Sequence, residues 1–397
     1  MMNLSHPLTE KIIPFISVSP EQKLAVENWW QTFDNDQIKL CDFYNGGTKM
    51  PIDIPAWMDK HLHAIDKDIM WEFGPGLKKA HRLVITSETN RLLRPLAQYI
   101  LNQAPEYKEW EFYEYRLAEG LEETQLTMNG RANWQDISEI KFELIQSEFN
   151  TLGIVYYIPT SLDLEKKERH SYNAYVLTES LLGEEILDKW VDYIDVELET
   201  KSKSSKKVKN SVQPLPNLKE AFSNELITIR SRLPKDLYYE VINNNDIGWA
   251  LMKATPREQD DYPQKQDLYV SPFLQVEGDL FNATYFGYND FFSERFSNHN
   301  EIFFYLKIDG AAEDLNQDIF IDSTTIEDIL DEALQKESLG CVIGGGTGLR
   351  YSYIDFALTD LGKAIEIIRE NLQKGKLTKR SWILFHDAIY QSQWIGV

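Results

Sequence analysis

The alternation of hydrophobic and polar positions is clearest in the C-terminal quarter of the chain. Strand-like apolar runs and helical repeats follow one another there, at residues 302–308, 326–334, 339–358, 361–372 and 381–385. The segment 339–358 contains two strand-like runs in succession, and the helical segments repeat apolar residues every three to four positions. The order is β-α-β-β-α-β, which predicts a ferredoxin-like module over about residues 302–386.

The N-terminal part also mixes helical and strand patterns. Ser19, Pro20 and Gln22 are typical of a helix start with a capping box. Residues 69–73 and 81–86 are rich in β-branched and aromatic residues on either side of a Gly-Pro-Gly turn, which predicts a hairpin.

Further elements are expected between these two parts. We predict strands at 110–116, 140–148, 152–158, 173–177, 237–241, 248–254, 268–276 and 281–285, and helices at 92–101, 181–196 and 218–233. Helices and strands are mixed throughout without a regular alternation, so the fold class is predicted to be α+β.

Residues 201–209, KSKSSKKVK, break the composition of the chain. A segment of Lys and Ser with one apolar residue buries too little surface to offset its ordering entropy, and it is typical of a linker. We therefore predict an N-terminal α+β domain at 1–200, a linker at 201–216 and a C-terminal α+β domain at 217–397. A basic docking tail is the alternative interpretation of the lysines.

Length and charge narrow the classes of protein further. A chain of 397 residues is longer than one core usually supports, which favours two domains. A net charge of −22 repels nucleic-acid backbones and anionic membranes, so neither is an expected partner. The same charge would attract a basic protein, although it is also explained by solubility alone.

The two cysteines, Cys41 and Cys341, are far apart in sequence and form no disulfide framework or metal knuckle. No long apolar run suits a membrane helix, and the N-terminus has no signal-peptide pattern. We expect a cytoplasmic protein of bacterial type.

The cluster Gly344–Gly348 invites a phosphate-binding interpretation, because backbone N–H groups of glycine turns can hold phosphates. Neither the Lys-Ser/Thr pair of a P-loop nor the spacing of a dinucleotide motif is present. Residues 350–358 alternate with period two, so a strand follows instead of a helix. We predict a hairpin whose glycines form the turn, with Arg350 and Asp355 as candidate binding residues, and no cofactor.

The other candidate metal-binding and catalytic residues have ordinary structural explanations. His61 and His63, with Asp59 nearby, would share a face and could bind a metal if their segment were a strand. The segment is expected to be helical, where positions two apart lie on different faces, and no third ligand is evident, so no metal site is predicted. His386-Asp387 and Glu72 are expected at edges or on the surface, since no nucleophile or orienting group can be assigned to them. No catalytic residue is therefore predicted.

The segment 285–292 is rich in aromatic residues. Tyr285, Tyr288 and Phe291 are candidate binding residues, because tyrosine and phenylalanine give large contact areas at low entropic cost. Burial in a core is the alternative for each of them.

Two stretches resemble known patterns. WEFGPG at 71–76, with HRLVITSE and the run from Pro95 to Arg116, resembles a recurrent pattern in uncharacterised bacterial proteins. GGGTGLRYSYIDFAL at 344–358 resembles modules of small bacterial proteins of unknown function and of some toxin-immunity proteins. Neither resemblance implies catalytic residues.

These observations favour a non-enzymatic protein that binds another protein, as an immunity or regulatory factor. The absence of a catalytic motif, the acidic charge and the open sheet edges of a ferredoxin-like module support this hypothesis. The alternative is a hydrolase whose site is assembled between the two domains.

Overall fold

The chain is described by a computed structural model that mixes helices with strands, which confirms the α+β class. The described residues are 18–47, 52–132, 134, 136–147, 149–162, 167–199, 212–244, 248–257, 262–274, 290–309, 323–375 and 381–397. Their contacts divide into two compact units: an N-terminal unit up to Leu226, and a C-terminal unit from Ile227 with which residues 149 and 150 are grouped.

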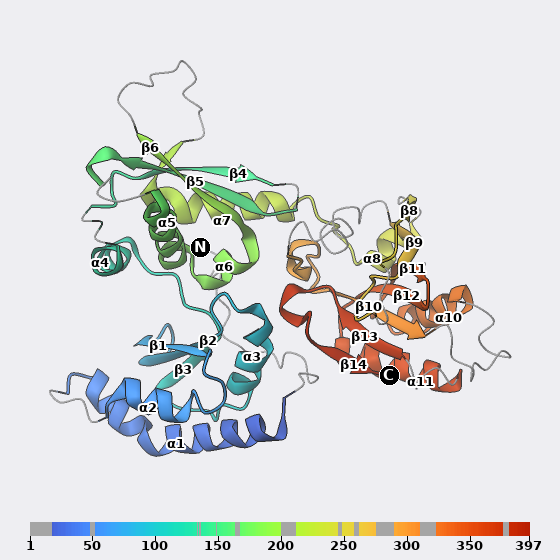
Figure 1. Cartoon of the computed structure of the whole chain (residues 1–397), viewed down its shortest axis with the longest axis horizontal. Helices are drawn as coiled ribbons and strands as arrows, with labels where there is room; N and C mark the ends of the chain where they lie inside the picture. Colours follow the sequence, from blue (N-terminus) through green and yellow to red (C-terminus); the bar gives the residue numbers. More distant parts are fainter. Residues whose placement is uncertain are drawn as a thin grey trace. The chain divides into compact units, whose positions relative to one another are not determined.

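The first sheet of the N-terminal unit has three strands. They are β1 (Met70–Pro75), β2 (His81–Thr86) and β3 (Trp110–Tyr113), in the order β1-β2-β3. The predicted hairpin is present, since β1 and β2 are antiparallel, and β3 runs parallel to β2. The helices on this sheet are α1 (Pro20–Tyr44), α2 (Ile54–His61) and α3 (Arg94–Asn102). Their apolar residues form one core with Leu83 and Ile85 of β2. Figure 1 shows α1 and α2 together on one side of this sheet.

The start of α1 confirms the predicted capping box. The Ser19 hydroxyl accepts from the Gln22 N–H at 3.1 Å, and the Gln22 side chain accepts from the Ser19 N–H at 3.2 Å. The helix continues to Tyr44, and Leu40 and Cys41 belong to its buried face.

The second sheet of the N-terminal unit has four strands in the order β6-β5-β4-β7. Its elements are α4 (Leu121–Arg131), β4 (Lys141–Gln146), β5 (Leu152–Pro159), α5 (Lys167–Leu182), α6 (Glu184–Trp190), β6 (Val191–Glu199), β7 (Gln213–Pro214) and α7 (Leu218–Arg230). β4 and β5 match the predicted strands 140–148 and 152–158 and form an antiparallel hairpin, and β6 runs parallel to β5.

Two predictions in this region are wrong. The expected strand 173–177 lies inside α5, where Ala174, Leu177 and Leu181 are buried at helical spacing. The expected helix 181–196 is not one helix: α5 ends at Leu182, α6 begins after Gly183 and ends at Trp190. The chain then continues as β6, because its pairing with β5 outweighs the local helical pattern.

The predicted linker 201–216 is described only in part, since residues 200–211 lie outside the described residues. Gln213–Pro214 forms β7 and pairs with β4, and the division between the units falls within α7, after Leu226. Residues 213–226 are therefore grouped with the N-terminal unit, not with the C-terminal domain expected from residue 217.

The C-terminal unit is built on a seven-stranded sheet in the order β14-β13-β10-β12-β11-β9-β8. Its elements are α8 (Tyr238–Asn243), β8 (Trp249–Lys253), β9 (Leu268–Leu274), β10 (Ile302–Asp309), α10 (Ser323–Lys336), β11 (Gly340–Gly348), β12 (Tyr351–Leu358), α11 (Leu361–Lys374), β13 (Ser381–Phe385) and β14 (Trp394–Gly396). The expected strand 237–241 is wrong, because these residues enter α8, and the expected strand 281–285 lies outside the described residues.

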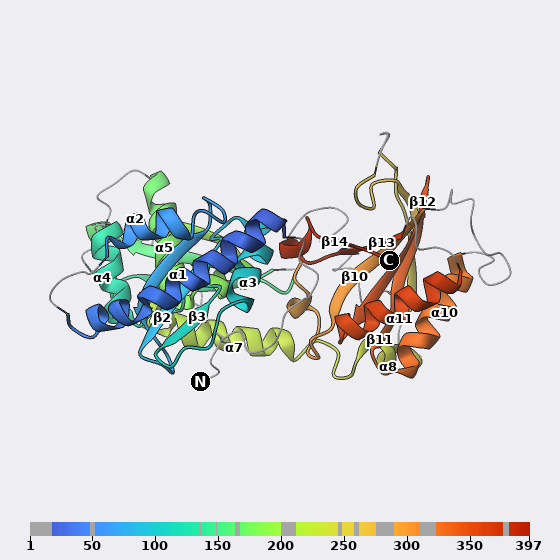
Figure 2. The ribbon, with the colours of Figure 1, turned by 90° about the horizontal axis from the view of Figure 1, so that it is seen from below.

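Helices α10 and α11 cover the same face of this sheet, as Figures 1 and 2 show. Their apolar residues form one core with alternate residues of β10, β12 and β13, such as Leu306, Ile354 and Ile383. The opposite face of the sheet carries the intervening residues, including Tyr305, Tyr353 and Asp355.

The hairpin predicted at 339–358 is present as β11 and β12, but its glycines are not in the turn. Gly344, Gly345 and Gly346 lie within β11, which is hydrogen-bonded to β9 on one side and to β12 on the other. None of these three glycines has a positive φ angle. Their role is close backbone approach in the middle of the sheet, so the predicted turn function is wrong.

Replacing Gly345 with alanine is expected to lower the free energy of unfolding by about 1–3 kcal/mol, as overpacking does. A Cβ atom there would lie 2.6 Å from the carbonyl oxygen of Tyr353, which the strand pairing holds in place. Urea unfolding monitored by circular dichroism measures the change. Gly362→Ala in α11 is the matched control, because its Cβ would meet only Asp360 at an ordinary 3.5 Å. An equal loss in both variants would contradict the explanation.

Candidate functional site

Asp355, predicted as a binding residue, lies in a buried polar group on the sheet face opposite α10 and α11. We call Lys265, Asp355 and His386, with Tyr305 and Tyr353, the Lys265 cluster. Asp355 Oδ1 accepts from Lys265 Nζ and lies 3.0 Å from His386 Nε2. The side chains of Lys265, Asp355 and His386 are only 13%, 10% and 6% exposed.

Several elements bring this cluster together. Asp355 comes from β12 opposite Tyr305 of β10, while His386 directly follows β13. Lys265 comes from the segment just before β9, and its ammonium lies 4.6 Å from the ring centre of Tyr305. The rings of Tyr305 and His386 are 5.0 Å apart. The ammonium is therefore held by a carboxylate and an aromatic face together.

Protonation states follow from burial and charge. Burial alone would raise the pKa of Asp355, but Lys265 and His386 outweigh it and lower this pKa to about 2. Burial lowers the pKa of His386, with Asp355 opposing the shift, and burial also lowers the pKa of Lys265. A neutral His386 that donates from Nε2 to the ionised Asp355 has its lone pair on Nδ1.

His386 and Asp387 are both buried, so the expectation of edge or surface positions is wrong. Asp387 accepts from the backbone N–H of Ser293 at 2.8 Å and from the hydroxyl of Ser293. The orienting carboxylate that the sequence could not assign to His386 is Asp355, 31 residues earlier in the chain.

Arg350, the other predicted residue of this hairpin, lies in the turn between β11 and β12. Its guanidinium donates to Asp309 Oδ2 at 2.9 Å, and its backbone N–H donates to Asp267 Oδ2 at 2.9 Å. Asp267 also accepts from the hydroxyl of Tyr353 and from the N–H of Tyr351. Arg350 and Asp355 thus belong to neighbouring polar contacts that fix the hairpin and the segment before β9 to each other.

The predicted aromatic residues have a different outcome. Phe291 is 1% exposed and packs in a core with Phe296 and Phe303, so the core alternative holds and its proposed surface role is wrong. Tyr285 and Tyr288 lie outside the described residues.

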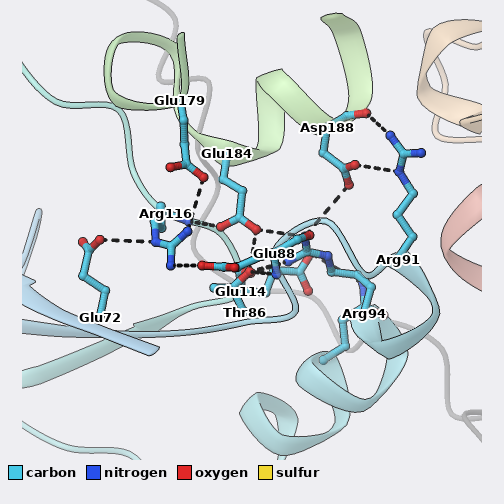
Figure 3. A network of polar contacts seen from close by, with 11 residues as sticks. Glu72, Thr86, Glu88, Arg91, Arg94, Glu114, Arg116, Glu179, Glu184 and Asp188 are labelled. Carbon is cyan, nitrogen blue, oxygen red and sulfur yellow. Dashed lines mark hydrogen bonds and ion pairs between the residues drawn. The ribbon is translucent and has the colours of Figure 1, made fainter. Parts of the chain in front are cut away.

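A second buried polar group lies in the N-terminal unit, around Glu184 at the start of α6 (Figure 3). We call it the Glu184 cluster. Glu184 Oε1 accepts from the Thr86 hydroxyl at 2.5 Å and from Arg94 Nη2 at 3.0 Å, and its Oε2 accepts from the Arg116 N–H at 2.9 Å. The Arg94 side chain is 0% exposed, and its guanidinium lies 3.9 Å from the ring centre of Tyr115.

Two further arginines extend the cluster, as Figure 3 shows. The Arg91 Nε donates to Asp188 Oδ1 at 2.6 Å, one helical turn beyond Glu184. The Arg116 guanidinium pairs with Glu179 at 3.3 Å and with Glu88. It also lies 3.5 Å from Glu72 Oε2. Glu72 is on β1, an edge strand of its sheet, as expected, and it additionally takes part in this ion pair.

The carboxyl group of Glu114, beside Arg94, has a raised pKa. Burial raises the pKa of Glu114 to about 7, although Arg94 and Lys189 act in the opposite direction. Its Oε2 atom is buried without a hydrogen-bond partner among the described residues. Burial likewise raises the pKa of Glu179, against the effect of Arg116.

An exposed apolar strand lies at one edge of the seven-stranded sheet. Trp249 and Leu251 of β8 are 54% and 63% exposed, and β8 pairs with β9 but with no other described strand. The N–H of Ala254 donates to the carbonyl of Tyr269, so at this position, directly after β8, the backbone groups point toward β9. Along an antiparallel strand, residues alternate between pointing toward the partner strand and pointing away from it. By this alternation, the N–H and C=O groups of Trp249 and Leu251 point away from β9.

Metal-binding side chains gather nowhere in the described part of the chain in groups of three or more. His63 Nδ1 lies 3.2 Å from Asp59 Oδ1, four residues earlier in the chain, and the two side chains are 21% and 81% exposed. Within the described residues, no helix is both long and apolar enough to cross a membrane.

Comparisons with protein-family models, curated protein sequences and solved structures give no match to this chain. The resemblances drawn from the two sequence stretches therefore stay predictions. The geometry of the described residues is what supports a function.

Lys265, His386 and Glu184 were missed as members of these clusters. Lys265 lies in an acidic, proline-containing loop and Glu184 at a helix start, where charged residues are ordinarily exposed. Glu184 is 90 residues from Arg94 in sequence. The sequence held one sign of a buried charge pair. Arg94 is a charged residue among the apolar residues at the start of α3, where it is buried.

Proposed function

We propose that the protein acts by binding another protein, as an immunity or regulatory factor, and that it does so through β8. The observation that carries this proposal is the pair of exposed apolar residues Trp249 and Leu251 on an edge strand with outward-pointing backbone groups. Such an edge is a template for an added strand. Lys253 is the one charged residue of β8, and it follows the two exposed apolar residues.

The partner segment follows from the same geometry. An added strand would place alternate side chains beside Trp249 and Leu251, so it needs apolar residues two positions apart. The net charge of −22 favours lysine and arginine at its other positions. We infer an extended, basic segment with alternating apolar residues, in a basic protein.

We also infer two features of the architecture that support this function. The order β10-α10-β11-β12-α11-β13, with sheet order β13-β10-β12-β11, supports a ferredoxin-like module within the C-terminal unit. The division of contacts supports two separate domains. In this arrangement β9 and β8 extend the four-stranded sheet of the module and provide its edge.

Selection from a peptide display library is expected to enrich basic, alternating sequences for this protein. Peptides so enriched should lose at least tenfold in affinity for Leu251→Pro, measured by fluorescence anisotropy. Proline removes an N–H that points outward, so it blocks the added strand without breaking a hydrogen bond to β9.

Two controls separate backbone pairing from side-chain contact. Leu251→Thr keeps the N–H and should lose less affinity than Leu251→Pro. Leu126→Thr, at a residue of α4 that is 71% exposed, should leave binding unchanged. Enriched peptides without alternation, or equal binding to Leu251→Pro, would rule out β8 as the site.

A hydrolase is the second candidate, and the observation that favours it is the His386–Asp355 pair. A neutral histidine oriented by a carboxylate can act as a general base. Ser293, which lies beside the end of β13, donates its hydroxyl to Asp387 and accepts from the Phe303 N–H. It is already engaged as a structural residue, which is why protein binding is the preferred proposal.

A further inference from the structure

The donors around Glu184 all come from one part of the chain, residues 86–116. They are the Thr86 hydroxyl at the end of β2, the Arg94 guanidinium at the start of α3 and the Arg116 N–H after β3. The carboxylate comes from α6, more than sixty residues later. Three donors, from the end of β2, from α3 and from the segment after β3, thus converge on one carboxylate of α6.

The Arg94 guanidinium is held in place independently of Glu184. Its Nη1 donates to the carbonyl of Glu114 at 2.7 Å, and its Nη2 donates to the carbonyl of Glu88 at 2.9 Å. The Tyr115 ring lies against its face. A buried cation fixed by backbone carbonyls and an aromatic ring keeps its position when the carboxylate is removed.

The approach of α6 to these donors depends on a glycine. Gly183 precedes Glu184 with φ +86°, and a Cβ there would lie 3.0 Å from the Ala118 N. The Glu184 N–H donates to the carbonyl of Arg116 at 3.0 Å. The backbone N–H and the carboxylate of Glu184 therefore bind the C=O and the N–H of Arg116, and Gly183 allows the close approach that both hydrogen bonds need.

We propose that Thr86, Arg94 and the Arg116 N–H form a binding site for a carboxylate, which Glu184 of α6 occupies within the same chain. One oxygen of the ligand receives two donors and the other receives one, which suits a planar carboxylate. The nearby carboxylates of Glu88, Glu179 and Asp188 repel an anion of higher charge, so the site selects a monoanion over sulfate or phosphate.

The test is chemical rescue of Glu184→Ala in the full chain. Formate should raise its unfolding temperature by several degrees, saturably, because a ligand that binds only the folded state stabilises it. Chloride and sulfate at the same ionic strength should give a smaller rise. Formate should have no such specific effect on the unsubstituted protein, where Glu184 fills the site, nor on Arg94→Met/Glu184→Ala.

The outcomes decide the proposal. Equal effects of formate and chloride on Glu184→Ala, or an equal formate effect in the double variant, would overturn it. If Glu184→Ala is insoluble, refolding from urea into formate or chloride gives the same comparison, with soluble yield as the readout. Glu184→Gln serves as a folded control, because its amide keeps the volume of the side chain and should leave no room for formate.

Discussion

Replacing Arg94 with alanine is expected to lower the free energy of unfolding by about 3–5 kcal/mol, since it leaves a buried charge without its partner. The uncompensated charge is Glu184, whose side chain is 3% exposed. The carbonyls of Glu88 and Glu114 would also lose donors. Urea unfolding monitored by circular dichroism measures the loss.

The matched comparison is Arg94→Met/Glu184→Leu, which removes both charges and keeps most of the volume. It should be clearly more stable than Arg94→Ala, because paired removal avoids an isolated buried ion. Lys39→Ala, which breaks an ion pair of α1 whose lysine is 58% exposed, should leave the unfolding midpoint unchanged. A double variant as unstable as Arg94→Ala would show that packing, not charge pairing, explains the effect.

Replacing Asp355 with alanine is expected to have a similar effect on the C-terminal unit, about 3–5 kcal/mol, because Lys265 is left as an unpaired buried cation. The expected pH dependence has a definite sign. Since the folded-state pKa of Asp355 is lowered to about 2, its contribution is present above its ordinary pKa and is lost as pH falls toward 2. Unfolding of the native chain and of Asp355→Ala should therefore differ most near neutral pH.

Urea unfolding at a series of pH values measures this difference. Lys363→Met is the control, because it breaks an ion pair with Glu337 whose side chains are 48% and 44% exposed, and it should leave the midpoint unchanged. A difference between the native chain and Asp355→Ala that stays constant down to pH 2 would contradict the proposed ionisation of Asp355.

The elements that local pattern determines were predicted well. The capping box at Ser19 and the hairpins at 70–86 and 141–159 depend on neighbouring residues, whose spacing is visible in the sequence. The strand expected at 173–177 and the helix expected through 196 failed because pairing and burial decided between two weak local preferences.

The hairpin of β11 and β12 was predicted correctly, but the position of its glycines was not. The alternation after Arg350 predicts a strand and hence a hairpin, not a phosphate loop, and the hairpin is present. Whether the glycines sit in the turn or in the strand depends on the atoms of β9 and β12 beside them, such as the Tyr353 carbonyl. Those neighbours become known only when the sheet order is known.

The sequence by itself determined the α+β class, the charge of −22 and most local elements, because these follow from composition and short-range periodicity. The tertiary structure alone decided which charges are buried together. Glu184 meets Thr86 across 98 residues, and Lys265 meets Asp355 across 90. Long-range pairing of single charged residues leaves no periodic trace in one sequence, so only the folded chain shows that these residues are paired.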